Sequence, residues 1–410
     1  MANNGFAVLR HKNFTLYLAA RVLSTMAVQM QSVAIGWQVY SMTGDVFDLG
    51  LIGLAQFAPF FALILFAGHA ADRYKRRSII LLCFGAQLVC AALLLAFTYA
   101  GLKQVWPIFL VLTLYGSARA FMSPASQAIL INMVPAESFS KAVALSSSSF
   151  HVAVIVGPAI GGLLYIYGPT VVYCVVVTML LMSLTLMSRA DTGPQPTSRE
   201  PVTWHSVFEG LRFVWSKPVI LGAISLDLFA VLFGGATALL PAIAHDILQV
   251  GPSGLGMLRA APGIGASLCS IALAFWPITR QVGAWMFGGV AVFGLATVVL
   301  GLTNSLWVAL AALILMGVGD MVSVYIRHLL VQYETPDAIR GRVSAVNAVF
   351  IGASNELGEF ESGITAGWFG LVPAIIFGGV VTIAVTAACS LGFPVLRRMD
   401  QFPEPINEKR

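Results

Sequence analysis

The sequence predicts an all-α membrane protein whose twelve transmembrane helices form two six-helix bundles. The chain of 410 residues is 58% hydrophobic and only 10% charged, whereas soluble domains carry about 25% charged residues. Apolar runs of about 18 residues or more, each long enough to cross a bilayer as a helix, recur along the whole chain. The polar faces that a large soluble helical core would need are missing from these runs. The two halves of the chain also repeat one another.

Twelve apolar runs can be read from the sequence. They cover residues 14–40, 46–70, 79–100, 105–133, 140–165, 169–188, 219–246, 253–277, 283–302, 305–333, 343–368 and 372–396. Strands of outer-membrane barrels alternate and are only about ten residues long, so these runs exclude such a barrel. The first run is too long for the apolar part of a signal peptide and has no good cleavage site, so we expect none.

Basic residues outside the apolar runs predict the orientation. If the N-terminus lies in the cytoplasm, every such Lys or Arg except Lys103 falls on the cytoplasmic side, as the positive-inside rule requires. We therefore expect a multi-pass protein of the cell (inner) membrane with both termini cytoplasmic. The net charge of +5 reflects this topology and not nucleic-acid binding. All five cysteines lie inside apolar runs, which indicates packing and not a disulfide or metal site.

One polar connection, residues 189–217, is much longer than the others and is rich in Pro, Ser and Thr. This composition predicts a cytoplasmic linker. The linker divides the chain into an N-terminal bundle, residues 1–188, and a C-terminal bundle, residues 218–410, with six runs each. Its end, "VFEGLRFVWSK", is amphipathic and basic, so we expect a short helix on the inner membrane surface.

The two halves repeat with a spacing of about 200 residues. "GLAQFAP" at Gly53–Pro59 matches "GMLRAAP" at Gly256–Pro262, and at nearly the same spacing Arg119 falls on Asp320. Each match lies on the corresponding run of its half. Parallel six-helix repeats are the architecture of secondary transporters in which two bundles rock against each other.

The loop after the second run reads "GHAADRYKRR". The residues that match the pattern G-x-x-x-D-R-x-G-R-R are Gly68, Asp72, Arg73, Arg76 and Arg77. Glycine allows close helix approach, an aspartate at a helix end accepts hydrogen bonds from a neighbouring helix N-terminus, and the arginines hold the loop in the cytoplasm. This loop resembles the signature loop of the major facilitator superfamily, although Lys75 replaces the usual glycine. The resemblance implies the two-bundle fold and a latch between the halves; a plain positive-inside loop is the alternative.

The fifth run carries "GPAIGG", with Gly157, Pro158, Gly161 and Gly162. It resembles the glycine–proline motif of the proton-antiporter branch of that superfamily. Small residues let membrane helices pack closely, and proline kinks a helix; close packing without a gating role is the alternative. The stretches 21–44, 119–135, 235–251 and 339–347 are similar to the bacterial enterobactin-exporter-like branch, which implies export of siderophores, macrolides or other amphipathic compounds.

Ionisable residues deep in an apolar run cost about 3 kcal/mol each and usually face a cavity or a partner. The candidates are Arg21, Arg119, Asp227, Arg259, Asp320, Glu356, Glu359 and Glu361. Arg119 and Asp320 are repeat-equivalent, and each lies about 21 Å into the bilayer. In the major facilitator fold their spans line the central cavity, so we expect them to attract across it; local pairing within each half is the alternative. A weaker contact between the halves is expected for Arg21 and Asp227, unless Arg21 has a local partner.

Glu356 and Glu359 are three residues apart and share a helix face, whereas Glu361 points to the opposite side. Two close carboxylates in a low-dielectric site can hold one proton between them, as a proton-coupling site requires. The same pair could bind a cationic substrate or a metal, or serve only a polar helix contact.

These observations predict a secondary active transporter that exports a small amphipathic compound, siderophore or drug-like, by proton-coupled alternating access. There is no phosphate-binding loop for ATP and no enzyme constellation, so we expect no cofactor and no resident metal. Expected partners are the small-molecule substrate, protons and the lipid bilayer, and the chain is expected to be a monomer. The alternatives are symport or uptake of a nutrient, metal or other cation, and a membrane sensor that transports nothing.

Overall fold

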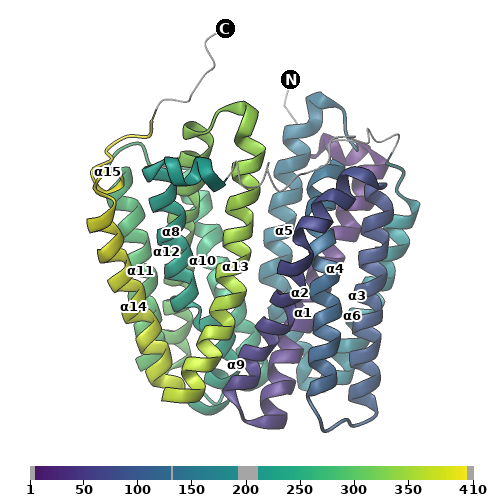
Figure 1. Ribbon diagram of the computed structural model, residues 1–410. Coiled ribbons are helices and arrows are strands. Elements are labelled where there is room, and N and C mark those ends of the chain that lie inside the picture. The colour runs from purple at the N-terminus through teal and green to yellow at the C-terminus, as the bar shows by residue number, and fades with distance from the viewer. Residues whose placement is uncertain (1–4, 131–132, 193–210, 404–410) are drawn as a thin grey trace. The chain divides into compact units, whose positions relative to one another are not determined.

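The computed structural model describes residues 5–130, 133–192 and 211–403, and these ranges are helical with no strand (Figure 1). The long helices are α1 (Lys12–Thr43), α2 (Val46–Arg73), α3 (Arg76–Tyr99), α4 (Trp106–Ile129), α5 (Ala136–Leu164), α6 (Pro169–Arg189), α8 (Pro218–Gly234), α10 (Gly251–Phe275), α11 (Val282–Leu302), α12 (Leu306–Glu334), α13 (Asp337–Phe369) and α14 (Leu371–Gly392). The shorter ones are η1 (Gly5–Arg10), η3 (Tyr165–Tyr167), η4 (Ala236–Leu239), α9 (Leu240–Ala242), η5 (Ile243–Ile247) and α15 (Pro394–Arg397).

The predicted all-α membrane fold is confirmed. Among the described helical segments, eleven are long and apolar enough to cross a membrane. The run predicted at 343–368 lies within α13, which has 33 residues and is more polar because it carries three glutamates. Each of the twelve predicted runs therefore corresponds to helical structure.

Glycines end the helices where the chain must reverse. Gly168, with φ of 101°, and Gly370, with φ of 90°, lie between α5 and α6 and between α13 and α14. Backbone of this kind is open to glycine and strained for other residues. Pro169 then begins α6, a position where the missing N–H costs nothing. The two halves thus use the same turn at equivalent places.

The seventh predicted run, 219–246, is interrupted. The α-helix α8 ends at Gly234, and the chain continues through the 3-10 turn η4, the short α9 and the π-turn η5. Two glycines in succession, Gly234 and Gly235, weaken the helix, and Pro241 removes a backbone donor. The extent of the run was predicted correctly, but its regularity was not.

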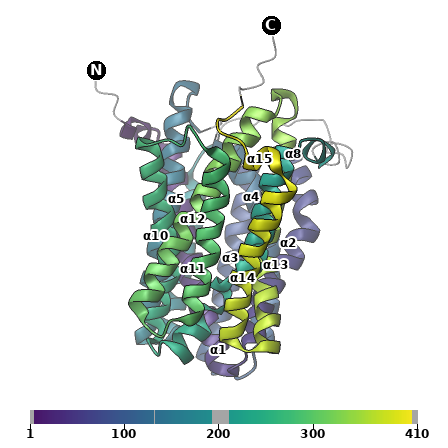
Figure 2. The ribbon, with the colours of Figure 1, turned by 90° about the vertical axis from the view of Figure 1, so that its left-hand side faces the viewer.

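The chain groups into two compact units. One comprises Met1–Gly44, Leu54–Pro201 and Val250–Ala260, and the other Asp45–Gly53, Val202–Gln249 and Ala261–Arg410. In the first unit α1 packs against α5 and α6, and α3 against α4 and α6; in the second, α11 packs against α12 and α14, and α8 against α13 and α14 (Figures 1 and 2).

The predicted linker lies mostly outside the described residues, which omit 193–210. Residues 211–216 are helical, and Val214 within them is buried. The division of the chain at 189–217 and the surface position of the amphipathic stretch remain predictions.

Candidate functional site

An ion pair is buried between α8 and α12. The Arg327 guanidinium donates to the Asp227 carboxylate, and the two side chains are only 2% and 6% exposed. Asp227 is the single charged residue of α8. Taking two charges out of water is tolerable only while both partners are present, and removing one partner of such a pair typically costs about 3–5 kcal/mol. Asp227, predicted to meet the other half of the chain, therefore has its partner within its own unit.

Asp320 lies on the same face of α12 as Arg327, because seven residues make about two helical turns. The other residues of that face are buried: Leu313, Met316 and Ser323 are at most 4% exposed. Asp320 itself is half-buried on this face. It is within electrostatic range of both Asp227 and Arg327. Two carboxylates thus lie within electrostatic range of one guanidinium, and one of them, Asp227, is paired with it.

Two buried polar atoms near this pair have no hydrogen-bond partner among the described residues. They are Ser323 Oγ, one turn from Asp320, and Arg327 Nε. Buried polar atoms are normally satisfied, and an unsatisfied one costs about 1–3 kcal/mol. The cluster of Asp227, Asp320, Ser323 and Arg327, which we call the α8/α12 cluster, therefore has unused hydrogen-bonding capacity.

Arg327 is a residue that the sequence reasoning missed. It lies inside the apolar run 305–333, seven residues after Asp320. A helical register drawn from Asp320 would have placed it on the same face. What the register does not give is the partner on α8, because that depends on how two helices are rotated toward each other.

Arg21 has a local partner. Its guanidinium donates to Ser146 Oγ on α5 and lies over the Phe150 ring, 5.5 Å from the centroid. The contact expected between Arg21 and Asp227 is therefore not needed to satisfy either residue, because Asp227 is paired with Arg327.

Two further arginines lie in the spans of the first unit. Arg119 of α4 is half-buried and sits over Phe60 of α2, 5.4 Å from the ring centroid, a contact worth roughly 0.5–2 kcal/mol. Arg259 of α10 donates to Ser32 Oγ of α1. Asp320 belongs to the other unit, so its attraction to Arg119 remains a prediction.

The glutamates of α13 lie beside the first residues of α2. Glu356 is 5% exposed, and Glu359 is half-buried. A Cβ built on Gly53 would lie 2.8 Å from Glu359 Cβ and 3.1 Å from the carbonyl oxygen of Glu356. Both glutamates also interact with other neighbours. Only a glycine at position 53 lets α2 pass this close to the pair.

The "GPAIGG" glycines are points of close helix contact. A Cβ on Gly157 would lie 2.7 Å from Gln29 Cβ, and one on Gly161 would lie 2.8 Å from Met30 Cα, both on α1. A Cβ on Gly162 would lie 2.9 Å from Gly256 Cα on α10. Within the first unit, α5 is thus held against both α1 and α10. Pro158 lies inside the same continuous helix.

The second unit repeats this packing. Gly358 lies against the Leu232 carbonyl of α8, 2.9 Å from a built Cβ, and a Cβ on Gly50 of α2 would lie 2.9 Å from Gly363 Cα on α13. Gly358 and Gly363 are the repeat equivalents of Gly157 and Gly162. The sequence repeat is therefore matched by equivalent helix contacts in the two units.

The signature-like loop joins α2 and α3. Arg77 donates to the Ser188 carbonyl near the end of α6, Arg73 is exposed, and Arg76 is half-buried. Among the described atoms, a Cβ on Gly68 would meet nothing within 4 Å, so the close helix approach expected there is not seen. The side chain of Asp72 lies outside the described part of the chain. The latch role of this loop remains a prediction.

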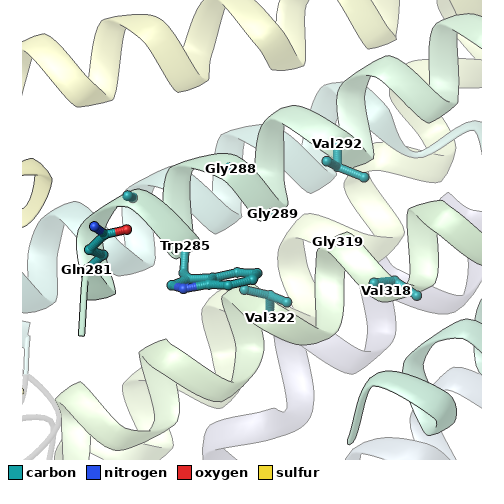
Figure 3. A pocket seen from close by; sticks show the side chains of 9 residues that line it. Gln281, Trp285, Gly288, Gly289, Val292, Val318, Gly319 and Val322 are labelled. Carbon is teal, nitrogen blue, oxygen red and sulfur yellow. The ribbon is translucent and has the colours of Figure 1, made fainter. Parts of the chain in front are cut away.

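A pocket of about 410 Å³ lies between α11 and α12 (Figure 3). Its lining combines three glycines, Gly288, Gly289 and Gly319, with Trp285 and small apolar side chains, and contains no ionisable group. Trp285 is 53% exposed. This pocket therefore lacks the charged groups of the α8/α12 cluster and is not the candidate site.

Comparisons with known proteins agree with this architecture. The family model described as "Transmembrane secretion effector" matches residues 3–408. Proteins named "Enterobactin exporter EntS" are similar over 97% of this chain and 95% of their own length, with 25% identity for the one from Shigella boydii and 24% for one from Escherichia coli.

Solved structures show the same fold. A bacterial homologue of the human lysosomal transporter Spinster, inward-facing and unoccupied, has a TM-score of 0.72 at 17% identity and covers 97% of both chains. A bacterial homologue of the iron transporter ferroportin, inward-facing, has a TM-score of 0.71 at 14% identity and covers 95% of this chain and 99% of its own. The chain therefore belongs to the transmembrane secretion effector family of the major facilitator superfamily, and it is a multi-pass membrane transporter and not an enzyme.

Proposed function

We propose that the protein is a proton-coupled secondary exporter of a small amphipathic compound, siderophore-like or drug-like. Relatives that match it over almost their entire length are named enterobactin exporters, which supports the exporter assignment. In this proposal the chain is a monomer of the cell inner membrane with both termini cytoplasmic. The bundles 1–188 and 218–410 rock against each other, connected by the linker 189–217.

The observation that carries the proposal is the placement of ionisable side chains on buried helix faces inside the spans. Asp227, Asp320 and Arg327 lie within α8 and α12, where apolar residues of similar volume would pack as well or better. A charge in a span costs about 3 kcal/mol on insertion scales and typically marks a substrate path or a proton relay. Carboxylates that bind and release a proton are what antiport requires.

Substrate contacts are proposed for the arginines that lie beside aromatic rings. Arg119 lies over the Phe60 ring and Arg21 lies over the Phe150 ring. Each pair therefore places a cation beside the apolar face of an aromatic ring. An amphipathic compound with polar groups on an aromatic or alicyclic body suits such a surface, because the guanidinium binds the polar groups and the ring contacts the body. Proton coupling is proposed for Asp320. The sequence predicts the same role for Glu356 and Glu359.

Gating is proposed for the paired glycine contacts. The contact of Gly162 with Gly256 and the contact of Gly50 with Gly363 are repeat-equivalent. Small residues at such a contact let the helix backbones approach closely, with no side chain between them. Alternating access requires contacts of this kind to be made in one state of the cycle and lost in the other.

The proposal is tested with purified protein in liposomes that carry an imposed pH gradient. A panel of a catecholate siderophore, a macrolide and a cationic dye is offered outside. Antiport predicts accumulation in vesicles with an acidic lumen and collapse of that accumulation by a protonophore. Symport predicts accumulation when the exterior is acidic, and a sensor predicts no transport. The exposed Asp246→Asn variant is the matched control for loss of a carboxylate.

A further inference from the structure

We propose that Asp320 binds the coupled proton and that Arg327, anchored by Asp227, positions it. In the proton-free state the guanidinium holds both carboxylates; in the proton-loaded state it holds Asp227 alone. This inference rests on the proposed function, since it names the residue at which proton coupling occurs, and it makes the α8/α12 cluster the coupling site in preference to the glutamates of α13.

The geometry of α12 permits the exchange. Side chains of a helix tilt toward its N-terminus, so Arg327 points toward Asp320, which precedes it by seven residues. The axial separation of about 10.5 Å can be bridged by an extended arginine and an aspartate that lie along one face. Arg327 uses one guanidinium nitrogen for Asp227, and its Nε is buried without a partner among the described residues. A donor is therefore in reserve for a second carboxylate.

The net charge of the α8/α12 cluster favours the binding of one proton. With both carboxylates ionised, the cluster of two aspartates and one arginine carries one net negative charge, which is costly to keep away from water. One proton makes it neutral. Asp227 is already held by Arg327, so the proton goes to Asp320, which is half-buried.

Ser323 completes the proton-loaded state. Ser323 is 1% exposed, its hydroxyl has no hydrogen-bond partner in the described part of the chain, and it lies one turn from Asp320. A protonated carboxyl is a donor and a hydroxyl is an acceptor, so protonated Asp320 can donate to Ser323 Oγ. When the proton leaves, the ionised carboxylate turns to the Arg327 guanidinium instead. One proton is taken up on one side of the membrane and given up on the other in each cycle.

Few other titratable groups surround the cluster. His328 is exposed and lies within electrostatic range of Asp227. Cys269 of α10 and Cys389 of α14 belong to the apolar cluster around α12. Tyr325 of α12 belongs to the same apolar cluster. The sequence of α11 contains no titratable residue, and Val343 of α13 shares an apolar cluster with Val331 of α12. The buried Glu356 lies on α13, which packs against α8. Asp227 and Asp320 are the two carboxylates of the α8/α12 cluster itself.

The test separates substrate exchange from proton-driven transport in the liposome assay. Asp320→Asn should keep counterflow, because exchange needs no net proton movement, and should lose accumulation driven by an acidic lumen. Asp320→Glu, which still titrates, should restore proton-driven accumulation. Ser323→Ala should shift the pH midpoint of driven transport, because protonated Asp320 loses its acceptor. The double variant Asp227→Asn with Arg327→Gln should shift that midpoint, because Asp320 then loses both of its charged neighbours at once.

The outcomes are distinct. A wild-type protein that shows no dependence on the pH gradient overturns both the proposed function and this inference. A wild-type protein that is proton-driven, together with an Asp320→Asn variant that is equally proton-driven, overturns the inference alone. If Asp320→Asn does not fold, the folded double variant provides the test. A shifted pH midpoint in that variant agrees with the assignment of Asp320 as the proton-binding residue. Complete loss of pH dependence contradicts that assignment.

Discussion

The contact between Gly162 of α5 and Gly256 of α10 allows the gating proposal to be tested by one methyl group. A Cβ on Gly162 would lie 2.5 Å from the Pro252 carbonyl oxygen and 2.9 Å from Gly256 Cα. Favourable separations between non-bonded carbon atoms are about 3.5–4.0 Å, so Gly162→Ala brings its methyl about 1 Å too close to backbone that cannot rotate away. Overpacking of this kind costs about 1–3 kcal/mol. If the contact exists in only one state of the cycle, that state becomes about 5 to 150 times less populated.

The assay is a distance distribution between spin labels in a cysteine-free background. Tyr167, at the end of η3, and Met257, on α10, are 77% and 43% exposed and accept labels. Gly162→Ala should enrich the population with the longer distance. The matched control is Gly288→Ala on α11, where an added Cβ meets nothing within 4 Å. Identical distributions for wild type and Gly162→Ala would refute the argument that this contact opens during transport.

Three further predictions follow from the same contacts. Arg327→Met should lower the melting temperature in detergent, because it leaves Asp227 buried and unpaired at a cost of about 3–5 kcal/mol; adding Asp227→Asn should recover most of the loss, and no recovery would contradict the ion-pair argument. Arg119→Ala should abolish transport in liposomes at an unchanged protein level, and full transport would remove Arg119 from the substrate path. Gly317→Ala should lower thermal stability more than Gly288→Ala, because its Cβ would overlap the Pro262 backbone; equal stabilities of the two variants would show that α12 and α10 separate freely.

Much of the fold follows from hydropathy alone. A chain segment that crosses a membrane has few alternatives to a helix, because its backbone polar groups must form their hydrogen bonds within the segment. The predicted runs therefore match the helices to within a few residues, and even α13 was found despite its glutamates. The break after Gly234 was not predicted, because glycine and proline in a span are compatible with either a continuous or an interrupted helix.

The candidate site was predicted less completely, for a physical reason. Depth and helix face follow from helical geometry, so Asp320 and Asp227 were placed inside spans from the sequence. Pairing depends on how neighbouring helices are rotated, which the sequence does not specify. That is why Arg21 pairs locally with Ser146 and why Asp227 pairs with Arg327, a residue absent from the predicted set. The sequence repeat did predict that Gly162 and Gly363 are equivalent, because positions where helices pack closely require small residues.

The measurement that bears most directly on the account is transport of a siderophore-like or drug-like compound into liposomes against an imposed pH gradient. Proton-coupled export predicts accumulation when the lumen is acidic, its loss with a protonophore, and counterflow without any gradient. Accumulation that requires an acidic exterior, or that is unaffected by the protonophore, would contradict it.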